Sequence, residues 1–577
     1  MGNCSPRSLE GGHFEHEQYA PMWVVKVEDV LEMTGRLQPH QVLKDQGLLV
    51  EWSSMMFSVF VSHQWLGFSH PDPSGEQLRV LQSILRNLIS GRIKVEHDAV
   101  SQINGCLRTL TLAECGRIQA GAIWLDYFSV PQHVGSSPIG EQPQYVRSIP
   151  SYVDRCEAFL ALTPSAAHEM GYRCNDDSWI QRGWCRLELW CKTLSTRSSI
   201  PVIQVTGHDV AQFTKPDWIH NPVHSGDFAL EEDRPASNRV VQAVLEHKLR
   251  ELRSRKNLTA YRFYKACFHT MIGVSVVERS IEEFLSEFAF SLPLKQHSGL
   301  GPVACAALAG DSQLVRSLAS SRASVNTLAP AMPEVNSVSG LSPLHLACMF
   351  RSHDLKLLHT LLELRADINS SNGFLSTPLG WCRTAGAVEL LIRHGSGVNE
   401  WGNLIFHMPP VEVALGLRAP CEVLAKLLEL RADVTSSSPF FSVAFAGGSN
   451  NSLNSARMLL GSKADVNQRQ LVVGIERKIE LAARAYCLCC REPPILAKFF
   501  ANISTTPLGY AAMFNNEDFL IFLLCARADP EIKNNRNLRP IDLASSERIR
   551  QLLRERLEWC EPCPLVSNVS DVSWFSI

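Results

Sequence analysis

The first half of the chain contains short apolar runs, and each of them ends at polar residues. The runs are MMFSVFV (55–61), AIWL (122–125), AFLAL (158–162) and PVIQV (201–205). Runs of this length and composition are typical of strands that are buried on both faces of a parallel sheet. The pattern therefore predicts four buried strands.

Between the first two runs lies the amphipathic segment EQLRVLQSILRNLI, at 76–89. On a helix, four of its leucines fall on one face: Leu78, Leu81, Leu85 and Leu88. Alternating strands and helices predict an α/β domain with an open parallel sheet and flanking helices. In such sheets, ligands bind beyond the carboxyl ends of the strands. We therefore expect four residues that follow the first two strands to share one rim: Ser62, His63, Trp65 and Asp126.

The second half of the chain repeats a phrase that closes a helix. Its copies are LASSRASVN, LLELRADIN, LLIRHGSGVN, LLELRADVT, LLGSKADVN and LLCARADPE, which end at residues 326, 369, 399, 435, 467 and 531. A second phrase opens helices and keeps step with the first: SPLHLA (342–347), TPLGWC (377–382), TPLGYAA (506–512) and RPIDLA (539–544). The closing phrases are spaced by 30 to 43 residues, except for a last interval of 64. This periodicity predicts stacked helical units.

These phrases resemble the ankyrin repeat, whose signature is TPLHxA and whose period is about 33 residues. The resemblance spans residues 299–547 and gives about seven units, some of them degenerate, in an all-α solenoid. Ankyrin arrays have no catalytic residues of their own and bind other proteins on a concave surface. The resemblance therefore implies a protein partner on the concave face, without naming it.

The local chemistry agrees with this resemblance at the start of the helices. Ser342 and Thr377 can cap helix N-termini, and the prolines that follow them suit the first helical position. The other end of the repeats departs from the ankyrin pattern, which usually has a left-handed glycine after the second helix. Four units have a basic residue there, and one keeps glycine: Arg365, Arg431, Lys463, Arg527 and Gly395. We expect a small local cost and an unchanged fold.

The interval of 64 residues contains RAYCLCCREPP, at 484–494, which matches no repeat. It predicts a loop or a decayed unit, and the sequence does not define the structure of residues 468–505.

Phrases in the first half resemble the Toll/interleukin receptor (TIR) domain and a distant relative, the heterokaryon-incompatibility domain. FVSHQWL (60–66) is similar to the first strand and loop of a TIR domain, and RGWCRLEL (182–189) is similar to its Trp-Cys phrase followed by Glu-Leu. IWLDYFSVPQ (123–132) and SIPSYVDRCEAFLAL (148–162) resemble the heterokaryon-incompatibility domain. The first two strands are farther apart than TIR domains usually allow. The resemblance implies a TIR-like domain that associates with copies of itself.

Some TIR domains cleave the nicotinamide–ribose bond of NAD, and the resemblance places their essential glutamate at Glu188. On a helix, Glu188 shares a face with Trp184, Leu187 and Cys191, so it is a lone carboxylate on an apolar stripe. Burying a carboxylate without a partner is costly. A carboxylate near the ribose can stabilise the positive charge that develops when an N-glycosidic bond breaks.

In this hypothesis NAD is a substrate, and no cofactor or metal is expected. Five residues would line the substrate site: Ser62, His63, Trp65, Asp126 and Trp184.

Each of these residues also has a structural explanation. Glu188 can pair with Arg182 or Arg186, His63 can be hydrogen-bonded at a strand end, and Trp184 can belong to the core. Many TIR domains act only as assembly modules. The first hypothesis is therefore a signalling protein with a non-catalytic TIR-like domain, and the alternative is a TIR-type NAD nucleosidase.

These features divide the chain into five parts. They are an N-terminal segment (1–50), the TIR-like α/β domain (51–195), a family-specific extension with connecting helices (196–298), the ankyrin repeats (299–547) and a C-terminal tail (548–577).

Charge and composition exclude several classes of function. With 55 basic and 58 acidic residues, the chain has a net charge of −3, which argues against binding nucleic acid through phosphate neutralisation. Hydrophobic residues make up 45% and charged residues 20%, as in globular proteins and unlike disordered ones. No apolar run is long enough for a transmembrane helix, and no phosphate-binding loop or dinucleotide fingerprint follows a predicted strand.

The N-terminus, MGNCSPRS, adds a link to membranes. Gly2 is where a myristoyl chain would attach, and Cys4 could carry a palmitoyl chain, although Pro6 departs from the myristoylation pattern. The remaining cysteines are scattered, and the pair Cys560 and Cys563 lacks the second pair that a zinc site needs. We expect reduced thiols in a cytoplasmic protein, with membrane association if the N-terminus is acylated.

Overall fold

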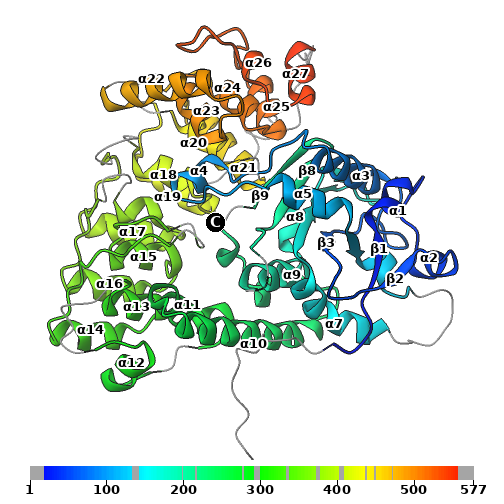
Figure 1. Cartoon of the computed structure of the whole chain (residues 1–577). Helices are drawn as coiled ribbons and strands as arrows, with labels where there is room; N and C mark the ends of the chain where they lie inside the picture. Colours follow the sequence, from blue (N-terminus) through cyan, green and yellow to red (C-terminus); the bar gives the residue numbers. More distant parts are fainter. Residues whose placement is uncertain are drawn as a thin grey trace, which may run out of the picture. The chain divides into compact units, whose positions relative to one another are not determined.

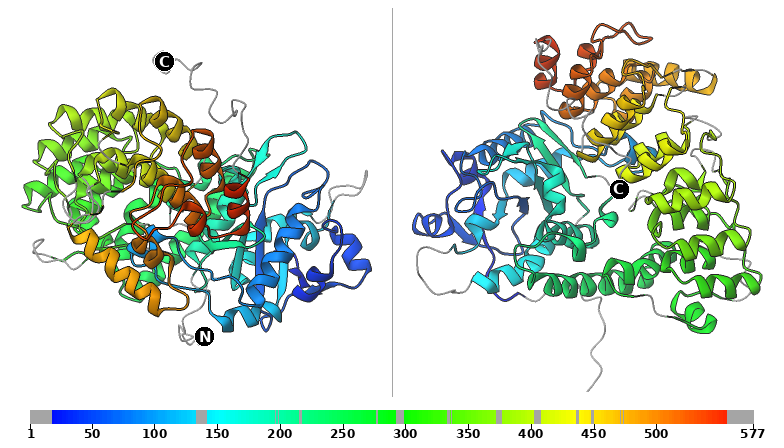
Figure 2. Two further views of the ribbon diagram at one scale, coloured as in Figure 1. Left: turned by 90° about the horizontal axis from the view of Figure 1, so that it is seen from above. Right: turned by 180° about the vertical axis from the view of Figure 1, so that it is seen from behind.

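The computed structural model forms two compact units, whose elements are shown in Figures 1 and 2. The sheet unit comprises residues 1–95, 109–214 and 221–254, and the helical unit comprises residues 96–108, 215–220 and 255–577. The structure describes residues 18–132, 142–195, 197, 199–214, 217–275, 278–291, 299–332, 335, 337–371, 377–401, 408–435, 438–447, 450–470, 472 and 474–555.

The sheet unit is built on a seven-stranded sheet with the strand order β2-β1-β4-β3-β5-β8-β9. Its strands are β1 (Trp23–Lys26), β2 (Leu49–Glu51), β3 (Ser58–His63), β4 (Ala122–Leu125), β5 (Ala158–Leu162), β8 (Ile203–Gly207) and β9 (Val210–Phe213). The four strands predicted from the apolar runs, β3, β4, β5 and β8, are parallel and form the centre.

The edges of the sheet differ from the prediction, because β1, β2 and β9 are antiparallel to their neighbours. The sheet is therefore mixed and not entirely parallel. Only two residues connect β8 to β9, and a connection this short can join antiparallel strands only. Strand β1 and most of β2 come from the segment 1–50, which the sequence analysis set apart from the α/β domain.

Strand β3 lies at the point where the strand order reverses. Along the chain β3 is followed by β4 and then β5, but in the sheet β3 lies between these two strands. The connections on the two sides of β3 therefore diverge. Such a reversal opens a crevice at the carboxyl ends of the strands.

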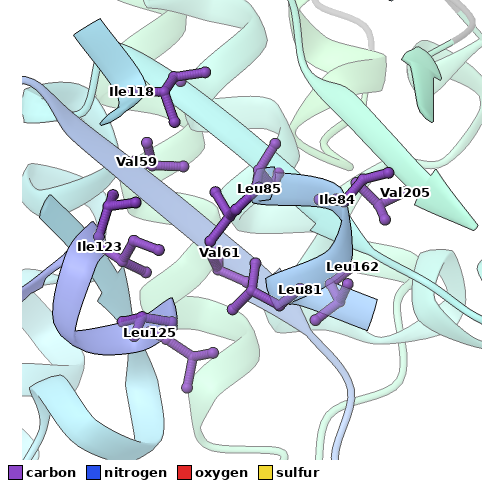
Figure 3. Close-up of a cluster of buried hydrophobic side chains, with 14 of the residues drawn as sticks. Val59, Val61, Leu81, Ile84, Leu85, Ile118, Ile123, Leu125, Leu162 and Val205 are labelled. Carbon is purple, nitrogen blue, oxygen red and sulfur yellow. The ribbon is translucent and has the colours of Figure 1, made fainter. Parts of the chain in front are cut away.

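One face of the central strands packs against helix α3 (Glu76–Ile89), the amphipathic segment predicted above. Val59 and Val61 of β3 point to this face, where Leu81 and Leu85 of α3 cover them (Figure 3). These four side chains are no more than 1% exposed. The predicted apolar stripe is thus the face that the helix buries.

The opposite face carries aromatic side chains. Phe60 lies between Trp124 and Phe159 of the neighbouring strands, with ring centroids 4.4 Å and 5.1 Å apart. Tyr152 of α7 (Gln142–Arg155) packs on Trp124 at 5.6 Å. Residues that alternate along β3 therefore enter two different layers.

The other elements of the sheet unit connect these layers. They are α1 (Val27–Glu32), α2 (His40–Asp45), α5 (Leu112–Gln119), α6 (Asp126–Ser129), β6 (Ala166–Ala167), β7 (Arg173–Cys174), α8 (Asp176–Gln181), α9 (Gly183–Leu194), η2 (Val223–Ser225) and α10 (Asp233–Ser254).

The helical unit contains seven helix pairs among its described residues. They are α13 (Pro302–Ala309) with α14 (Ser312–Ser320), α15 (Pro343–Phe350) with α16 (Leu355–Glu363), η4 (Pro378–Trp381) with α17 (Ala385–Arg393), α18 (Pro410–Gly416) with α19 (Cys421–Glu429), α20 (Pro439–Ala446) with α21 (Asn450–Gly461), α24 (Pro507–Met513) with α25 (Glu517–Cys525), and α26 (Pro540–Leu543) with α27 (Glu547–Arg554). First helices pack on first helices, and second helices on second helices, in two layers (Figure 2).

Every first helix of these pairs begins with proline, whose fixed φ suits that position. Ser342 caps α15 by accepting from the N–H of His345, as predicted. Thr377 makes no such bond, because its short 3-10 turn differs from an α-helix, whereas Thr506 caps α24. The last pair includes α27, so the ordered array continues to Arg554, past the boundary at residue 547.

The basic residues after the second helices are left-handed, as their position in the repeat requires. Their φ values are 64° for Arg322, 64° for Arg365, 65° for Arg431, 65° for Lys463 and 63° for Arg527, against 97° for Gly395. Left-handed backbone costs an L-residue about 1–2 kcal/mol relative to the right-handed form. The array accepts this cost at five positions and keeps its fold.

The 64-residue interval contains two inserted helices, α22 (Gly474–Cys489) and α23 (Ile495–Ala501), which precede the repeat α24–α25. The backbone N–H of Asp529 donates to Asn467 Oδ1 at 2.8 Å, a bond also made by Asp367 to Asn326 and by Asp433 to Asn399. Because this bond joins the loops of successive pairs, α24–α25 stacks directly on α20–α21. The interval thus contains an insertion between two adjacent repeats.

Further elements of the helical unit are α4 (Ala99–Ile103), η1 (Trp218–His220), α11 (Leu258–Met271) and α12 (Ile281–Glu287).

Candidate functional site

Ser62 and His63 end β3 and point to opposite sides of the sheet. Ser62 follows the direction of Phe60 toward α8 and α9, and His63 follows Val61 toward α3. Glu188 lies in the second turn of α9, and Asp126 begins α6 directly after β4. Two carboxyl groups therefore meet the end of the central strand, each through a different neighbour.

Glu188 is held by Ser62. The hydroxyl of Ser62 lies 2.5 Å from Glu188 Oε2 and accepts a hydrogen bond from Trp179 Nε1 at 3.0 Å. Because the indole uses a lone pair of the hydroxyl, the Ser62 proton is free to point at Glu188. Burial raises the pKa of Glu188 to about 8, against the opposing effects of the Ser62 bond and the charge of His63, while the charge of Asp126 raises it further.

His63 is held as an imidazolium. Its Nδ1 lies 3.0 Å from Gln77 Oε1, and its Nε2 lies 2.7 Å from Asp126 Oδ1. The amide of Gln77 cannot be turned round, because its Nε2 donates to the carbonyls of Gln64 and Pro71. Both ring nitrogens of His63 therefore face acceptors and must both carry protons. Burial alone would lower the pKa of His63, but the charge of Asp126 and the bonds from its two partners raise it.

Asp126 is the counter-ion of this imidazolium. Its Oδ2 accepts from Trp65 Nε1 at 3.0 Å, so both carboxylate oxygens have donors. Burial would raise the pKa of Asp126, but the charge of His63 and the hydrogen bonds hold it below its usual value. At neutral pH, Asp126 is ionised while Glu188 is mostly protonated. Two carboxyl groups with pKa values driven apart are characteristic of acid–base sites.

The structure brings together five of the six residues expected at this site: Ser62, His63, Trp65, Asp126 and Glu188. Trp184 lies elsewhere. Its indole donates to Asp233 Oδ2 at 3.1 Å, and its ring meets Phe228 edge-on. Trp184 lies one turn before Glu188 on α9, but its side chain points toward α10 and not toward Glu188.

The contacts of Arg186 and His63 bear on the structural explanations that the sequence analysis gave for Glu188 and His63. Arg186 donates to the carbonyls of Ile180 and Pro222 and so turns away from Glu188. His63, by contrast, has no ring nitrogen left for a substrate, because Gln77 and Asp126 occupy both. In this geometry His63 holds Asp126.

Sequence reasoning missed Gln77 and Trp179, which hold His63 and Ser62. Gln77 is a buried polar residue at the head of the apolar face of α3, and this interruption of the apolar pattern was a usable signal. Trp179 lies among polar residues of α8, where no periodic pattern distinguishes it.

Metal binding, acylation and membrane spanning are the remaining features considered in the sequence analysis. Among the described residues, no group of three or more His, Cys, Asp or Glu side chains is arranged to hold a metal ion. Gly2, Cys4, Cys560 and Cys563 lie outside the described residues. In the described part of the chain, no helix combines the length and the apolar character needed to cross a membrane.

The helical unit has an apolar hollow of about 200 Å³. It is lined by first helices, by connecting loops and by α4, and its lining includes Val100, Ile103, Met408, Leu417, Trp381 and Phe445. Trp381 is only 2% exposed, and its indole N–H has no acceptor among the described residues. A buried donor without a partner is rare and costs free energy.

Comparisons with known proteins concern the helical unit. Residues 339–373 and 505–535 match the ankyrin-repeat family model. The crystal structure of the human ASB11 ankyrin repeat domain is 20% identical, with a TM-score of 0.31, and the match covers 44% of this chain and 97% of that one. The ankyrin repeat domain of Bcl-3, an IkappaB family member, is 18% identical, with a TM-score of 0.28, over 45% and 100%.

No curated protein matches the chain. The family model nevertheless matches the second of the seven proline-started helix pairs, α15–α16, and the sixth, α24–α25. The helical unit therefore contains ankyrin repeats.

Proposed function

We propose that the chain is a signalling protein whose ankyrin repeats bind a protein partner through the concave surface formed by first helices and connecting loops. Ankyrin repeats serve in general as protein-binding arrays. The observation that carries the proposal is the apolar hollow on this surface, whose lining includes Trp381, Met408 and Phe445. An exposed apolar hollow is typical of binding sites.

Substitutions in the lining of the hollow test this proposal. Met408 and Leu417 are half-buried, so Met408→Glu and Leu417→Glu place charge in the hollow with little effect on the core. Leu355→Glu on α16 is the matched control, because Leu355 is 43% exposed on the layer of second helices. Proximity labelling with the full chain should recover partners with wild type and the control but not with the two hollow variants. Equal recovery from all four chains would refute this binding surface.

We also propose that the sheet unit is TIR-like and associates with copies of itself, as the phrases FVSHQWL and RGWCRLEL imply. Support comes from the order of its four parallel strands, in which the first lies between the second and the third, as in doubly wound sheets of the flavodoxin type. Light scattering of the purified chain over a range of concentrations tests this part. A mass equal to one chain at every concentration, with and without partner, would contradict it.

A second candidate function is cleavage of the nicotinamide–ribose bond of NAD, with Glu188 as the catalytic carboxylate. The observation that favours it is the position of Glu188 at the end of β3, where the strand order reverses. Glu188 is hydrogen-bonded there to Ser62, which in turn accepts from Trp179. In this reaction the bond between ribose C1′ and the ring nitrogen breaks, its electron pair stays on nicotinamide, and water adds to C1′ and releases a proton. Ionised Glu188 would stabilise the positive charge on the ribose.

Nicotinamide release by the purified chain tests this candidate. Because ionised Glu188 is the active form, kcat/KM should rise with pH up to about 8 and then level off. Glu188→Gln should abolish release, whereas Glu157→Gln, at a carboxyl group that binds the backbone of Ser58, should not. Absence of release by wild type, including under conditions that favour assembly, would leave the non-catalytic function.

A further inference from the structure

Helix α4 borders the hollow and presents an apolar face to it. Val100 and Ile103, three residues apart on α4, both line the hollow, and both are half-buried. Asp98 caps the helix by accepting from the backbone N–H groups of Val100 and Ser101, at 2.9 Å and 3.2 Å. Such a cap makes a five-residue helix possible. The segment 96–108 therefore resembles a short amphipathic ligand helix.

The same segment is tied to the inserted helices. Glu96 Oε1 accepts from the backbone N–H of Ile495, the first residue of α23, at 3.1 Å, and Glu96 Oε2 accepts from Gln102 at 3.2 Å. The carboxylate thus meets the positive end of α23. The contact of Glu96 with Ile495 joins this segment to α23, while Val100 and Ile103 of α4 line the hollow.

The hollow beside α4 is open to solvent. With α4 in place, about 200 Å³ stays unfilled at a lining that includes Phe445 and Leu417. An exposed apolar surface of this kind is typical of sites where another protein binds. A helix with larger side chains at the positions of Val100 and Ile103 would bury more of this lining than α4 does.

We infer that the hollow is the docking site for an amphipathic helix of a protein partner and that α4 is its internal occupant, which the partner displaces. The partner helix carries leucine, methionine or aromatic residues one turn apart, at the places of Val100 and Ile103. This inference rests on the proposed binding of a partner by the repeats. It adds the chemistry of the partner and a competitor within the chain.

The test uses a fluorescent peptide of residues 95–109 with Val100→Leu, Ile103→Leu and Cys106→Ser, titrated against full-length protein. In a chain with Val100→Asp and Ile103→Asp, α4 should leave the hollow, so the peptide should bind this variant about tenfold or more tightly than wild type. Adding Leu417→Glu to the variant should remove binding. A peptide that itself carries Val100→Asp and Ile103→Asp is the control and should not bind.

Hydrogen exchange supplies a second measurement on the same proteins. Amides of α18 and α20 should exchange faster in the Val100→Asp, Ile103→Asp variant than in wild type, while those of α16 should not change. Equal peptide affinity for variant and wild type, or unchanged exchange in α18 and α20, would overturn the inference. If the variant instead forms dimers in light scattering, the occupant is a second copy, and the inference is also wrong.

These outcomes are distinguishable from a failure of the proposed function. If partner recovery depends on Met408 and Leu417 but the peptide does not bind, the partner site remains and α4 is not its occupant. If recovery does not depend on them, the partner site itself is refuted.

Discussion

The two units use polar side chains in opposite ways. In the sheet unit, polar groups from distant parts of the chain converge on one rim, so that Ser62 meets Glu188 across 126 residues and His63 meets Asp126 across 63. In the helical unit, one such bond recurs between three pairs of neighbouring repeats, as between Asn326 and Asp367. The sheet unit thus gathers charged side chains at one place, whereas the helical unit has hydrogen bonds between loops at intervals along the array.

This difference separates two kinds of contribution. A hydrogen bond between the loops of neighbouring repeats stabilises the stack. Loss of one such bond affects only the interface between those two repeats. A converging cluster holds a buried ion pair and a protonated carboxyl group, which are costly to bury and are typical of functional sites. Substitutions in each unit can therefore test this difference.

The largest effect is expected from Asp126→Ala, which leaves the imidazolium of His63 and the indole of Trp65 without their acceptor. We expect a loss of about 3 kcal/mol in the free energy of unfolding, at the low end for a broken buried pair because Asp126 is 35% exposed. Asp126→Asn should lose less, since a neutral His63 can accept from the amide. Urea denaturation of the three chains measures this.

The pH dependence of this loss has a definite sign. The pKa of His63 is raised in the folded chain and that of Asp126 is lowered, so their ion pair contributes fully between about pH 4 and pH 6.5 and fades as the pH rises through the folded pKa of His63. The difference between wild type and Asp126→Ala should therefore shrink at alkaline pH. A difference that grows with pH would contradict the imidazolium.

A smaller effect is expected from Asn399→Ala in the helical unit. Asn399 accepts from the N–H of Asp433 at 2.8 Å and donates to the carbonyl of Arg431 at 3.2 Å, in an exposed position. Loss of both bonds should lower stability by about 1 kcal/mol. Asn454→Ala is the control, because Asn454 bonds within its own helix, and it should be neutral. If Asn399→Ala and Asn454→Ala changed the free energy of unfolding equally, the hydrogen bonds between neighbouring loops would contribute nothing to stability.

The smallest effects concern the left-handed positions, where substitutions in opposite directions should have opposite signs. Gly395→Ala should cost about 1 kcal/mol through the backbone alone, because an added Cβ meets nothing within 4 Å. Arg431→Gly should gain somewhat less than about 1 kcal/mol, since glycine also gains entropy in the unfolded chain. Thermal denaturation compares the two, and a loss for Arg431→Gly would mean that the arginine side chain contributes more than its strained backbone costs.

Sequence alone predicted the parts of the fold that depend on local periodicity. The four central strands follow from apolar runs, α3 from its leucine stripe, and the repeats from phrases such as LLELRAD. The antiparallel edges were not predicted, because β1 and β2 are short strands in a segment without alternating hydrophobicity. The inserted helices α22 and α23 were also missed, since they follow neither the repeat phrases nor their spacing.

The candidate site was predicted in part for a related reason. Residues that directly follow strands, such as Ser62 and Asp126, are placed by topology, and the sequence indicates their rim. The partners that decide their charge state, such as Gln77, come from another element, and only packing brings them there. Trp184 shows the limit of helix-face arguments, because its indole meets Asp233 of α10.

The central claim is that Glu188 lies at the carboxyl ends of the strands because of its function, although its burial does not stabilise the folded chain. Comparing the free energy of unfolding of wild type and Glu188→Gln at pH 5 and pH 9 tests this directly. The folded chain holds the Glu188 proton up to about pH 8, and the unfolded chain releases it near pH 4.5, so wild type loses stability between these values while the variant does not. We predict similar stability at pH 5 and a variant more stable by about 1 kcal/mol or more at pH 9. A variant less stable than wild type at both values would show that Glu188 is a structural residue.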